Sequence, residues 1–304
     1  MNFYFGIDGG GTKSRITLST DKGLIIKSIE GDSTNPFAVG FDKACTNATK
    51  LIVTALEAAG RKKEDQVFGC IGSAGLGRVN DIAHFEEKLK SLLPYVHTFI
   101  TNDARILLEG ALDGNDGMIL ISGTGSVCMG KTKGQIIKTG GFGWRLGDEG
   151  SGWWLSKEAI KRCLKSKEKR DLETDMTEDL ISFFHMDNVF SFISYINDDK
   201  TEKGIVAKAS SIVLAHAEKK DPLAQSIVEE GAEELFALVE TTYKKIGMGN
   251  KKLVLYGGVM ENNHYYRSIV ETLISNRLPD IEILRSPIHS SLEGALSLAK
   301  STSF

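Results

Sequence analysis

The sequence is poor in cysteine and proline. It has four cysteines and five prolines in 304 residues, and no two cysteines form a C-x-x-C pair. Such wide spacing argues against a disulfide framework and against a zinc or iron–sulfur site built from thiolates. We therefore predict that all four are small buried apolar residues. They are Cys45, Cys70, Cys128 and Cys163.

Long hydrophobic runs and strong charge are also missing. No run of about 18 apolar residues could span a membrane. The start, MNFYFGIDGGG, has neither the charged segment nor the cleavage signal of a secretory peptide. The net charge is −3 and no long basic run occurs, which argues against nucleic acid and anionic membranes as partners. We expect a cytoplasmic protein.

Glycine, in contrast, is abundant, with 32 residues. Three glycine-rich turns each follow an apolar strand, at residues 8–13, 122–126 and 257–259. Glycines let backbone N–H groups reach a phosphate, and Thr or Ser hydroxyls add donors. A plain hairpin is the alternative for any one turn, but three together favour phosphate binding. No Walker A motif is present, and residues 14–19 alternate as a strand where a dinucleotide fingerprint needs a helix.

The periodicity predicts two α/β halves. The first has strands at 2–8, 14–19, 24–29, 67–73 and 96–101, with helices at 42–59 and 81–92. The second begins with a strand at 117–122 and two more, and residues 133–138 resemble residues 22–27, which indicates duplication. It continues with strands at 253–256 and 281–284. Its helices are expected at 150–164, 173–184, 201–218, 222–246, 262–275 and 290–300, the last capped by Ser290 or Ser291 with Glu293 near N3.

These motifs carry a family resemblance. The turns at 8–13 and 122–126 resemble the two phosphate motifs of actin-like proteins, and Gly257-Gly258-Val259 resembles their adenosine motif. More narrowly, the chain resembles the N-acetylglucosamine kinase branch of the BadF/BadG/BcrA/BcrD ATPase family. The segments that carry this narrower likeness are Ser33-Thr34-Asn35-Pro36, Thr101-Asn102-Asp103-Ala104, Gly140-Gly141-Phe142-Gly143 and Gly147-Asp148-Glu149-Gly150-Ser151.

The resemblance implies two duplicated ribonuclease H-like (actin-like) domains with a cleft between them. The first would hold residues 1–113 and the closing helix at 290–304, and the second residues 114–289 with a helical insertion. It also implies ATP and Mg²⁺ as cofactors, transfer of phosphate to the 6-hydroxyl of N-acetylglucosamine or N-acetylmuramic acid, and a homodimer. The residues implied in ATP binding are Gly10, Gly11, Thr12, Lys13, Gly123, Thr124, Gly125, Gly257, Gly258 and Val259.

Roles for single side chains follow from the same resemblance. Asp103 would bind the sugar and take the proton of its hydroxyl as general base, with a helix N-cap as the alternative. Asp8 would orient magnesium through water. Lys13, although in the motif, suits a solvated charge better than a Walker-type lysine. The motif from 122 to 151 is the most specific part of the likeness.

Four further residues are implied in sugar binding. Asn35 and Asp148 would bind hydroxyls; the alternatives are a turn residue before Pro36 for Asn35 and a cap or charge pair for Asp148. Gly141 and Phe142 would line the sugar pocket. Relatives often carry Trp at the Phe142 position, so this departure bears on the fit around the N-acetyl group.

Other functions remain open at this point. Glucosamine is an alternative substrate. A non-kinase ATPase switch of the dehydratase-activator type shares the glycine motifs, but it needs cysteines for an iron–sulfur cluster. A sugar sensor is a third possibility. Trp153 and Trp154 are expected in the core, and none of the six histidines has a metal-ligand spacing.

Overall fold

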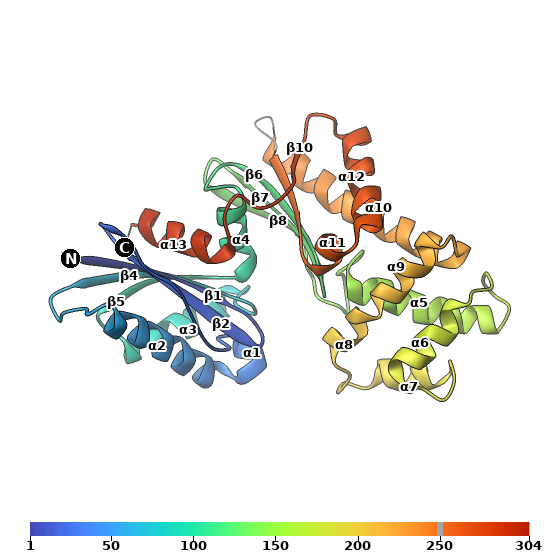
Figure 1. The fold of residues 1–304 in the computed structure, drawn as a ribbon, viewed down its shortest axis with the longest axis horizontal. Helices are drawn as coiled ribbons and strands as arrows, with labels where there is room; N and C mark the ends of the chain where they lie inside the picture. The colour runs from blue at the N-terminus through green and yellow to red at the C-terminus, as the bar shows by residue number, and fades with distance from the viewer. Residues whose placement is uncertain (248–251, 304) are drawn as a thin grey trace. The chain divides into compact units, whose positions relative to one another are not determined.

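The computed structural model describes residues 1–247 and 252–303, which form two compact units (Figure 1). Unit 1 comprises residues 1–115 and 287–304, and unit 2 comprises residues 116–286. The end of the chain thus returns to the unit in which the chain begins.

Unit 1 is built on a five-stranded sheet of order β3-β2-β1-β4-β5. The first three strands form an antiparallel meander, while β4 runs parallel to β1 and β5 parallel to β4. The carboxyl ends of β1, β4 and β5 therefore lie along the same edge of the sheet. The strands are β1 (Asn2–Gly9), β2 (Lys13–Thr20), β3 (Gly23–Asp32), β4 (Gln66–Ser73) and β5 (Val96–Thr101).

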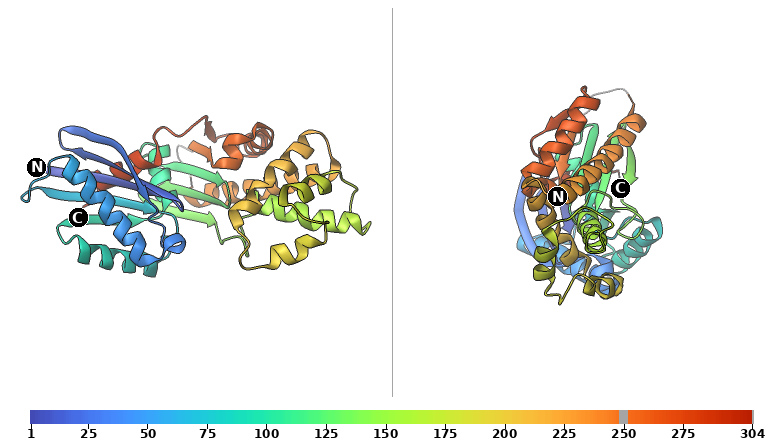
Figure 2. Two further views of the ribbon diagram at one scale, coloured as in Figure 1. Left: turned by 60° about the horizontal axis from the view of Figure 1, so that its bottom comes forward. Right: turned by 90° about the vertical axis from the view of Figure 1, so that its right-hand side faces the viewer.

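Helices cover both faces of this sheet (Figure 2). Phe5 and Ile7 pack in one core with α2 and α3, whereas Cys70 packs on the other face with Ile106 and Ala295 of α4 and α13. This division follows from the period of two along a strand. The helices are α1 (Pro36–Val39), α2 (Phe41–Ala58), α3 (Val79–Leu92), α4 (Asp103–Ala111) and α13 (Ser291–Ser301).

Unit 2 repeats the topology of unit 1. Its sheet has the order β10-β9-β6-β7-β8, with β6, β7 and β8 antiparallel and β9 and β10 joined in parallel. The matching segments 22–27 and 133–138 both lead into a third strand, so the predicted duplication is confirmed. The strands are β6 (Gly117–Ser122), β7 (Ser126–Thr132), β8 (Gln135–Gly140), β9 (Lys252–Tyr256) and β10 (Glu282–Leu284).

The helices of unit 2 differ in part from the prediction. One helix was expected over 201–218, but the structure breaks it at Ala209, whose N–H donates to Val206 three residues back. The short helices α7 and α11 were not predicted, because so few residues leave little periodicity to detect. The helices are α5 (Gly152–Lys167), α6 (Met176–Phe184), α7 (Ser191–Asn197), α8 (Lys203–Lys208), α9 (Ser210–Glu218), α10 (Pro222–Ile246), α11 (Gly258–Asn262) and α12 (His264–Arg277).

Several local predictions are confirmed. All four cysteines are buried, and Trp153 and Trp154 lie in the core of unit 2. Ser290 caps α13, and the Glu293 side chain accepts from the Ser290 N–H, which completes a capping box. None of the helices in the described residues is long and apolar enough to cross a membrane.

Candidate active site

The first glycine turn of unit 1 joins β1 to β2. The Gly10 N–H donates to the Lys13 carbonyl at 3.0 Å, which closes the turn. Within the described residues, the N–H groups of Gly11 and Thr12 donate to no protein acceptor, and both residues are exposed. Free N–H groups in a turn are the donors that bind a phosphate.

Beneath this turn lies a buried cluster of three hydroxyl groups, which we call the hydroxyl cluster: Ser14, Thr34 and Ser73. The Thr34 Oγ1 is 3.0 Å from Ser14 Oγ and 3.2 Å from Ser73 Oγ. A Cβ on Gly9 would lie 2.1 Å from Thr34 Oγ1, so only glycine fits beside the cluster. The cluster joins β2 to the segment after β3 and to the last residue of β4. Sequence reasoning missed it, and its only signal was hydroxyl residues at strand ends.

Asn35 follows the cluster directly. Its Oδ1 accepts from the Phe37 N–H at 2.9 Å, so Asn35 is the N-cap of α1. The expected turn role is thus present. It does not exclude sugar binding, because a Cβ on Gly11 would lie 3.9 Å from Asn35 Nδ2, which places this amide nitrogen near the first glycine turn.

Asp8 and Asp103 lie at the carboxyl ends of β1 and β5, on one edge of the sheet. The N-cap of α4 is Asn102, whose Oδ1 accepts from the Arg105 N–H at 2.8 Å. Asp103 therefore is not the cap. Its own Oδ1 accepts from the neighbouring Ala104 N–H at 2.9 Å.

The electrostatics of this edge favour a protonatable Asp103. Desolvation by the surrounding protein raises the pKa of Asp103, the Asp8 carboxylate adds to the rise, and the Ala104 N–H opposes it. The side chain is nevertheless exposed, so a hydroxyl group can reach it. A carboxyl with a raised pKa, open to solvent at a strand end, is suited to accept a proton.

Asp8 is held by two neighbours. Its Oδ2 accepts from Arg15 Nη2 at 3.1 Å and from Ser291 Oγ at 2.7 Å. Among the described residues, no group of three His, Cys, Asp or Glu side chains could hold a metal ion. A single fixed carboxylate fits Mg²⁺, which keeps most of its water shell and binds phosphate oxygens.

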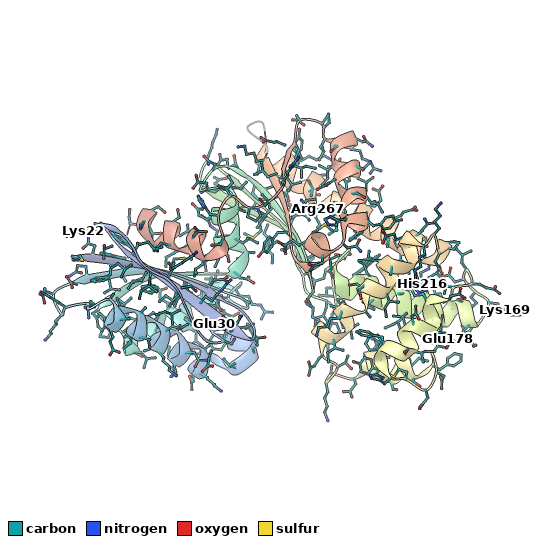
Figure 3. The ribbon with its side chains drawn as sticks, in the orientation of Figure 1. Lys22, Glu30, Lys169, Glu178, His216 and Arg267 are labelled. Atoms are coloured by element: carbon teal, nitrogen blue, oxygen red, sulfur yellow. The ribbon has the colours of Figure 1, made fainter. Side chains whose placement is uncertain are left out.

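The Lys13 side chain forms a surface ion pair rather than a contact with Asp8 or Asp103. Its Nζ pairs with Glu30 Oε2 at 2.7 Å across β2 and β3, and both side chains are more than half exposed (Figure 3 labels Glu30). This geometry agrees with a solvated charge. Any contribution of residue 13 to phosphate binding would then come from its backbone.

The second glycine turn joins β6 to β7 in unit 2 and resembles the first. The Gly123 N–H donates to the Gly125 carbonyl at 3.0 Å. In the described part of the chain, the N–H groups of Thr124 and Gly125 have no protein acceptor. The start of α5 packs on this turn, because the Gly152 N–H donates to the Gly123 carbonyl at 2.8 Å.

The third turn lies against the second. A Cβ on Gly257 would lie 3.1 Å from the Gly123 nitrogen, and Gly257 has a φ of 100°, so glycine is required there. Beside both turns is a cavity of about 670 Å³. It is lined by residues of the two turns and of α6, α8, α9 and the α11–α12 region: Gly123, Thr124, Phe183, Glu202, Gly204, Ile205, Ala207, Lys208, Ser210, Ser211, Leu214, Gly258, Val259, Asn262 and Asn263.

Most of this lining was not found from the sequence. Gly123, Thr124, Gly258 and Val259 were predicted, but the walls from α6, α8 and α9 were not. Those walls carry ordinary helical residues, and only the folding of the insertion onto the glycine turns brings them to one cavity.

The segment from 141 to 150, which we call the 141–150 loop, holds the remaining predicted residues. Asp148 is only 4% exposed and has a φ of 61°. Its Oδ2 accepts from Lys203 Nζ at 3.1 Å, so the expected charge pair is present. Gly141 has a φ of 66°, and Phe142 is 73% exposed, leaving its ring free for a ligand.

The structure thus groups the predicted residues by unit. Unit 1 brings together the first glycine turn, Asp8, Asn35 and Asp103. Unit 2 brings together the second and third turns and Asp148, which lies against Gly125: a Cβ there would be 2.7 Å from the Asp148 Oδ2.

Two α/β units of one topology, each with a glycine turn between its first two strands, define the actin-like class of proteins. The model of the BadF/BadG/BcrA/BcrD ATPase family matches residues 5–299, and the chain belongs to that family.

Known proteins resemble the whole chain. It is 33% identical to the N-acetylmuramic acid/N-acetylglucosamine kinase of Clostridium acetobutylicum, over 99% of each chain. It is 27% identical to the N-acetyl-D-glucosamine kinase of Dictyostelium discoideum, over 96% of each. A solved structure from Chromobacterium violaceum, classed as a candidate N-acetylglucosamine kinase, has the same fold, with a TM-score of 0.76, 23% identity and 98% of each chain covered.

Proposed function

We propose that this protein is an ATP-dependent amino-sugar kinase that phosphorylates N-acetylglucosamine, N-acetylmuramic acid or both at the 6-hydroxyl. The observation that carries the proposal is made within unit 1, where Asp103, with its raised pKa, shares one edge of the sheet with a glycine turn whose Gly11 and Thr12 N–H groups are free. The 33% identity to the Clostridium acetobutylicum enzyme along the whole chain supports this substrate class.

In this proposal the nucleotide binds mainly to unit 2. The turns at 123–125 and 257–259 hold the phosphates and adenosine of ATP, and the cavity of about 670 Å³ beside them takes the nucleoside. In unit 1, Gly11 and Thr12 offer free N–H groups as phosphate donors, and Gly10 closes the turn that presents them. Mg²⁺, oriented by Asp8 through water, supplies charge neutralisation to the phosphates.

The sugar binds to short polar side chains. Asn35 and Asp148 hold hydroxyl groups, and Gly141 and Phe142 contact the sugar ring and its substituent. Asp103 takes the proton of the 6-hydroxyl as that oxygen attacks the γ-phosphorus. A raised pKa makes this carboxylate a better base than an ordinary Asp.

The decisive experiment measures ADP release with Mg-ATP over a panel of N-acetylglucosamine, N-acetylmuramic acid, glucosamine, N-acetylmannosamine and glucose. We expect turnover with one or both N-acetylated sugars. In Asp103→Asn, kcat should fall about 10²–10⁴-fold, the usual contribution of a general base, while calorimetry shows sugar binding intact. Normal turnover by this variant would refute the base assignment.

Turnover restricted to glucosamine is the second candidate outcome, because the chain is also 24% identical to glucosamine kinase GspK of Vibrio cholerae. The ATPase-switch alternative is less well supported. A cluster ligand must be a thiolate, but burial raises the pKa of Cys45 and Cys163 to about 11 and that of Cys128 to about 12. ATP hydrolysis without sugar transfer would favour the switch.

We also propose that the enzyme acts in the cytoplasm as a homodimer. The family resemblance supports both statements. Light scattering on the purified protein, with and without Mg-ATP and sugar, tests the dimer: a mass near the 33.2 kDa of one chain at all concentrations would refute it.

A further inference from the structure

Two ion pairs join the 141–150 loop to the start of α8 and the segment just before it. The inner pair is Asp148 with Lys203, whose Nζ is 3.1 Å from the Asp148 Oδ2. The outer pair is Arg145 with Asp199, at 2.6 Å. They differ in exposure: the Asp148 side chain is 6% exposed, while those of Arg145 and Asp199 are 64% and 87% exposed. The Lys203 side chain is 33% exposed, so the shielding of the inner pair comes from the buried Asp148 carboxylate.

Lys203 belongs to a helix that also forms a wall of the nucleotide cavity. Of the residues of α8, Gly204, Ile205, Ala207 and Lys208 line it, together with Glu202 just before the helix. Lys203 itself is absent from the lining and instead reaches Asp148. One short helix therefore contacts the 141–150 loop through one lysine and the cavity through the neighbours of that lysine.

Asp148 and α8 are closely packed against the second glycine turn. A Cβ on Gly125 would lie 2.7 Å from the Asp148 Oδ2, so this carboxylate sits directly on the second glycine turn. A Cβ on Gly152 would lie 2.9 Å from the Ala207 carbonyl and 3.2 Å from the Gly123 carbonyl, so α5, α8 and the turn approach closely. A displacement of α8 or of Asp148 is thus transmitted to the second glycine turn.

Charge explains why the lysine matters. A carboxylate with so little exposure needs a cation or several donors, because burial of an unpaired charge is strongly unfavourable. Among the contacts of the described residues, Lys203 is the cation on Asp148. Its ammonium group fixes the carboxylate oxygen that it binds and leaves the other oxygen for a sugar hydroxyl.

We propose that Lys203 is a positioning residue that couples sugar binding at Asp148 to nucleotide binding in the cavity walled by α8. A sugar hydroxyl on Asp148 immobilises the Asp148–Lys203 pair and with it α8, so the nucleotide meets a preformed wall. The coupling is reciprocal, since each ligand must raise the affinity of the other by the same factor. This inference rests on the proposed function, because it takes Asp148 as a sugar ligand.

The test measures binding rather than turnover. A non-hydrolysable ATP analogue with Mg²⁺ is titrated by calorimetry with and without saturating N-acetylglucosamine, or the sugar that proves to be the substrate. We expect the sugar to tighten nucleotide binding by a factor of about 5–150, the usual range of coupling. In Lys203→Met this factor should fall to about 1. The separate variant Lys203→Arg keeps a cation and should retain most of the wild-type coupling factor.

Asp199→Asn is the matched control, because it breaks the outer pair between the same two segments. An exposed pair contributes little, so the coupling factor should stay within about twofold of the wild-type value. A simple loss of stability would lower both affinities without changing their ratio. If Lys203→Met does not fold, Lys203→Gln keeps a donor without the charge and carries the same expectation.

The outcomes separate the two proposals. A wild-type enzyme that phosphorylates sugar but shows no coupling, or a Lys203→Met enzyme with undiminished coupling, overturns the role of Lys203 and leaves the kinase intact. A wild-type protein that binds nucleotide but phosphorylates no sugar of the panel overturns the proposed function itself.

Discussion

Thr34 gives the sharpest test of how unit 1 holds its site. The change to valine keeps the shape of the side chain and removes the hydroxyl group from the centre of the hydroxyl cluster. Thr34 Oγ1 has two buried partners, at 3.0 Å and 3.2 Å. Each buried hydrogen bond contributes about 1 kcal/mol to stability.

The partners do not lose every hydrogen bond in this variant. Ser14 Oγ still accepts from the Thr34 N–H at 2.9 Å, and Ser73 Oγ still donates to the Thr34 carbonyl at 3.0 Å. No orphaned polar group is therefore added, and Thr34→Val should lower the free energy of unfolding by about 1–2 kcal/mol. Because Asn35 follows directly, the KM for sugar should rise more than kcat falls.

Urea denaturation and sugar kinetics measure both effects. Thr46→Val is the matched control, since the Thr46 hydroxyl lies on the exposed surface of α2 and donates only to the Asp42 carbonyl. Its effect on stability should stay within about 0.5 kcal/mol, with an unchanged KM. If Thr34→Val behaved like this control in both measurements, the hydroxyl cluster would not organise the site.

Three further predictions concern charge and close packing. The raised pKa of Asp103 means that kcat/KM should begin to fall, as pH is lowered, at a higher pH than for an ordinary Asp; a pH–rate profile tests this. Arg162 holds the pKa of Asp171 at about 2, below its value of 3.8 when unfolded, so the pair's stabilisation of about 2 kcal/mol is present above pH 4 and lost as pH falls towards 2. Measured by urea denaturation, Asp171→Asn should lower the free energy of unfolding by this amount at pH 7 and leave it nearly unchanged at pH 2. Gly125→Ala should displace the Asp148 carboxylate and lower kcat/KM by up to about 100-fold, and an unchanged value would show that Asp148 is not a ligand.

Most of the secondary structure in unit 1 was predictable because its periodicity is strong. The strands at 2–8 and 67–73 were expected and are present as β1 and β4. The prediction failed in the helical insertion of unit 2, where one expected helix is two and α7 was missed. Short helices are defined there by the surfaces on which they pack rather than by their own pattern.

The candidate site was predicted unevenly for a similar reason. Glycine turns and acidic residues at strand ends leave a signal in the sequence, because few residue types can occupy those positions. The wall formed by α8 leaves none, and the N-cap of α4 proved to be Asn102 rather than Asp103. A cap is settled by which of two adjacent side chains turns back to the helix.

The sequence alone determined the duplicated α/β plan, the three glycine turns and the acidic residue at the end of β5, since each depends on local pattern and on residue types with few substitutes. Tertiary structure decided which groups share a surface. Lys203 lies 55 residues from Asp148 in the chain, yet its ammonium group is bound to that carboxylate. Such a pairing depends on how α8 packs against the 141–150 loop, and the local sequence around either residue does not indicate it.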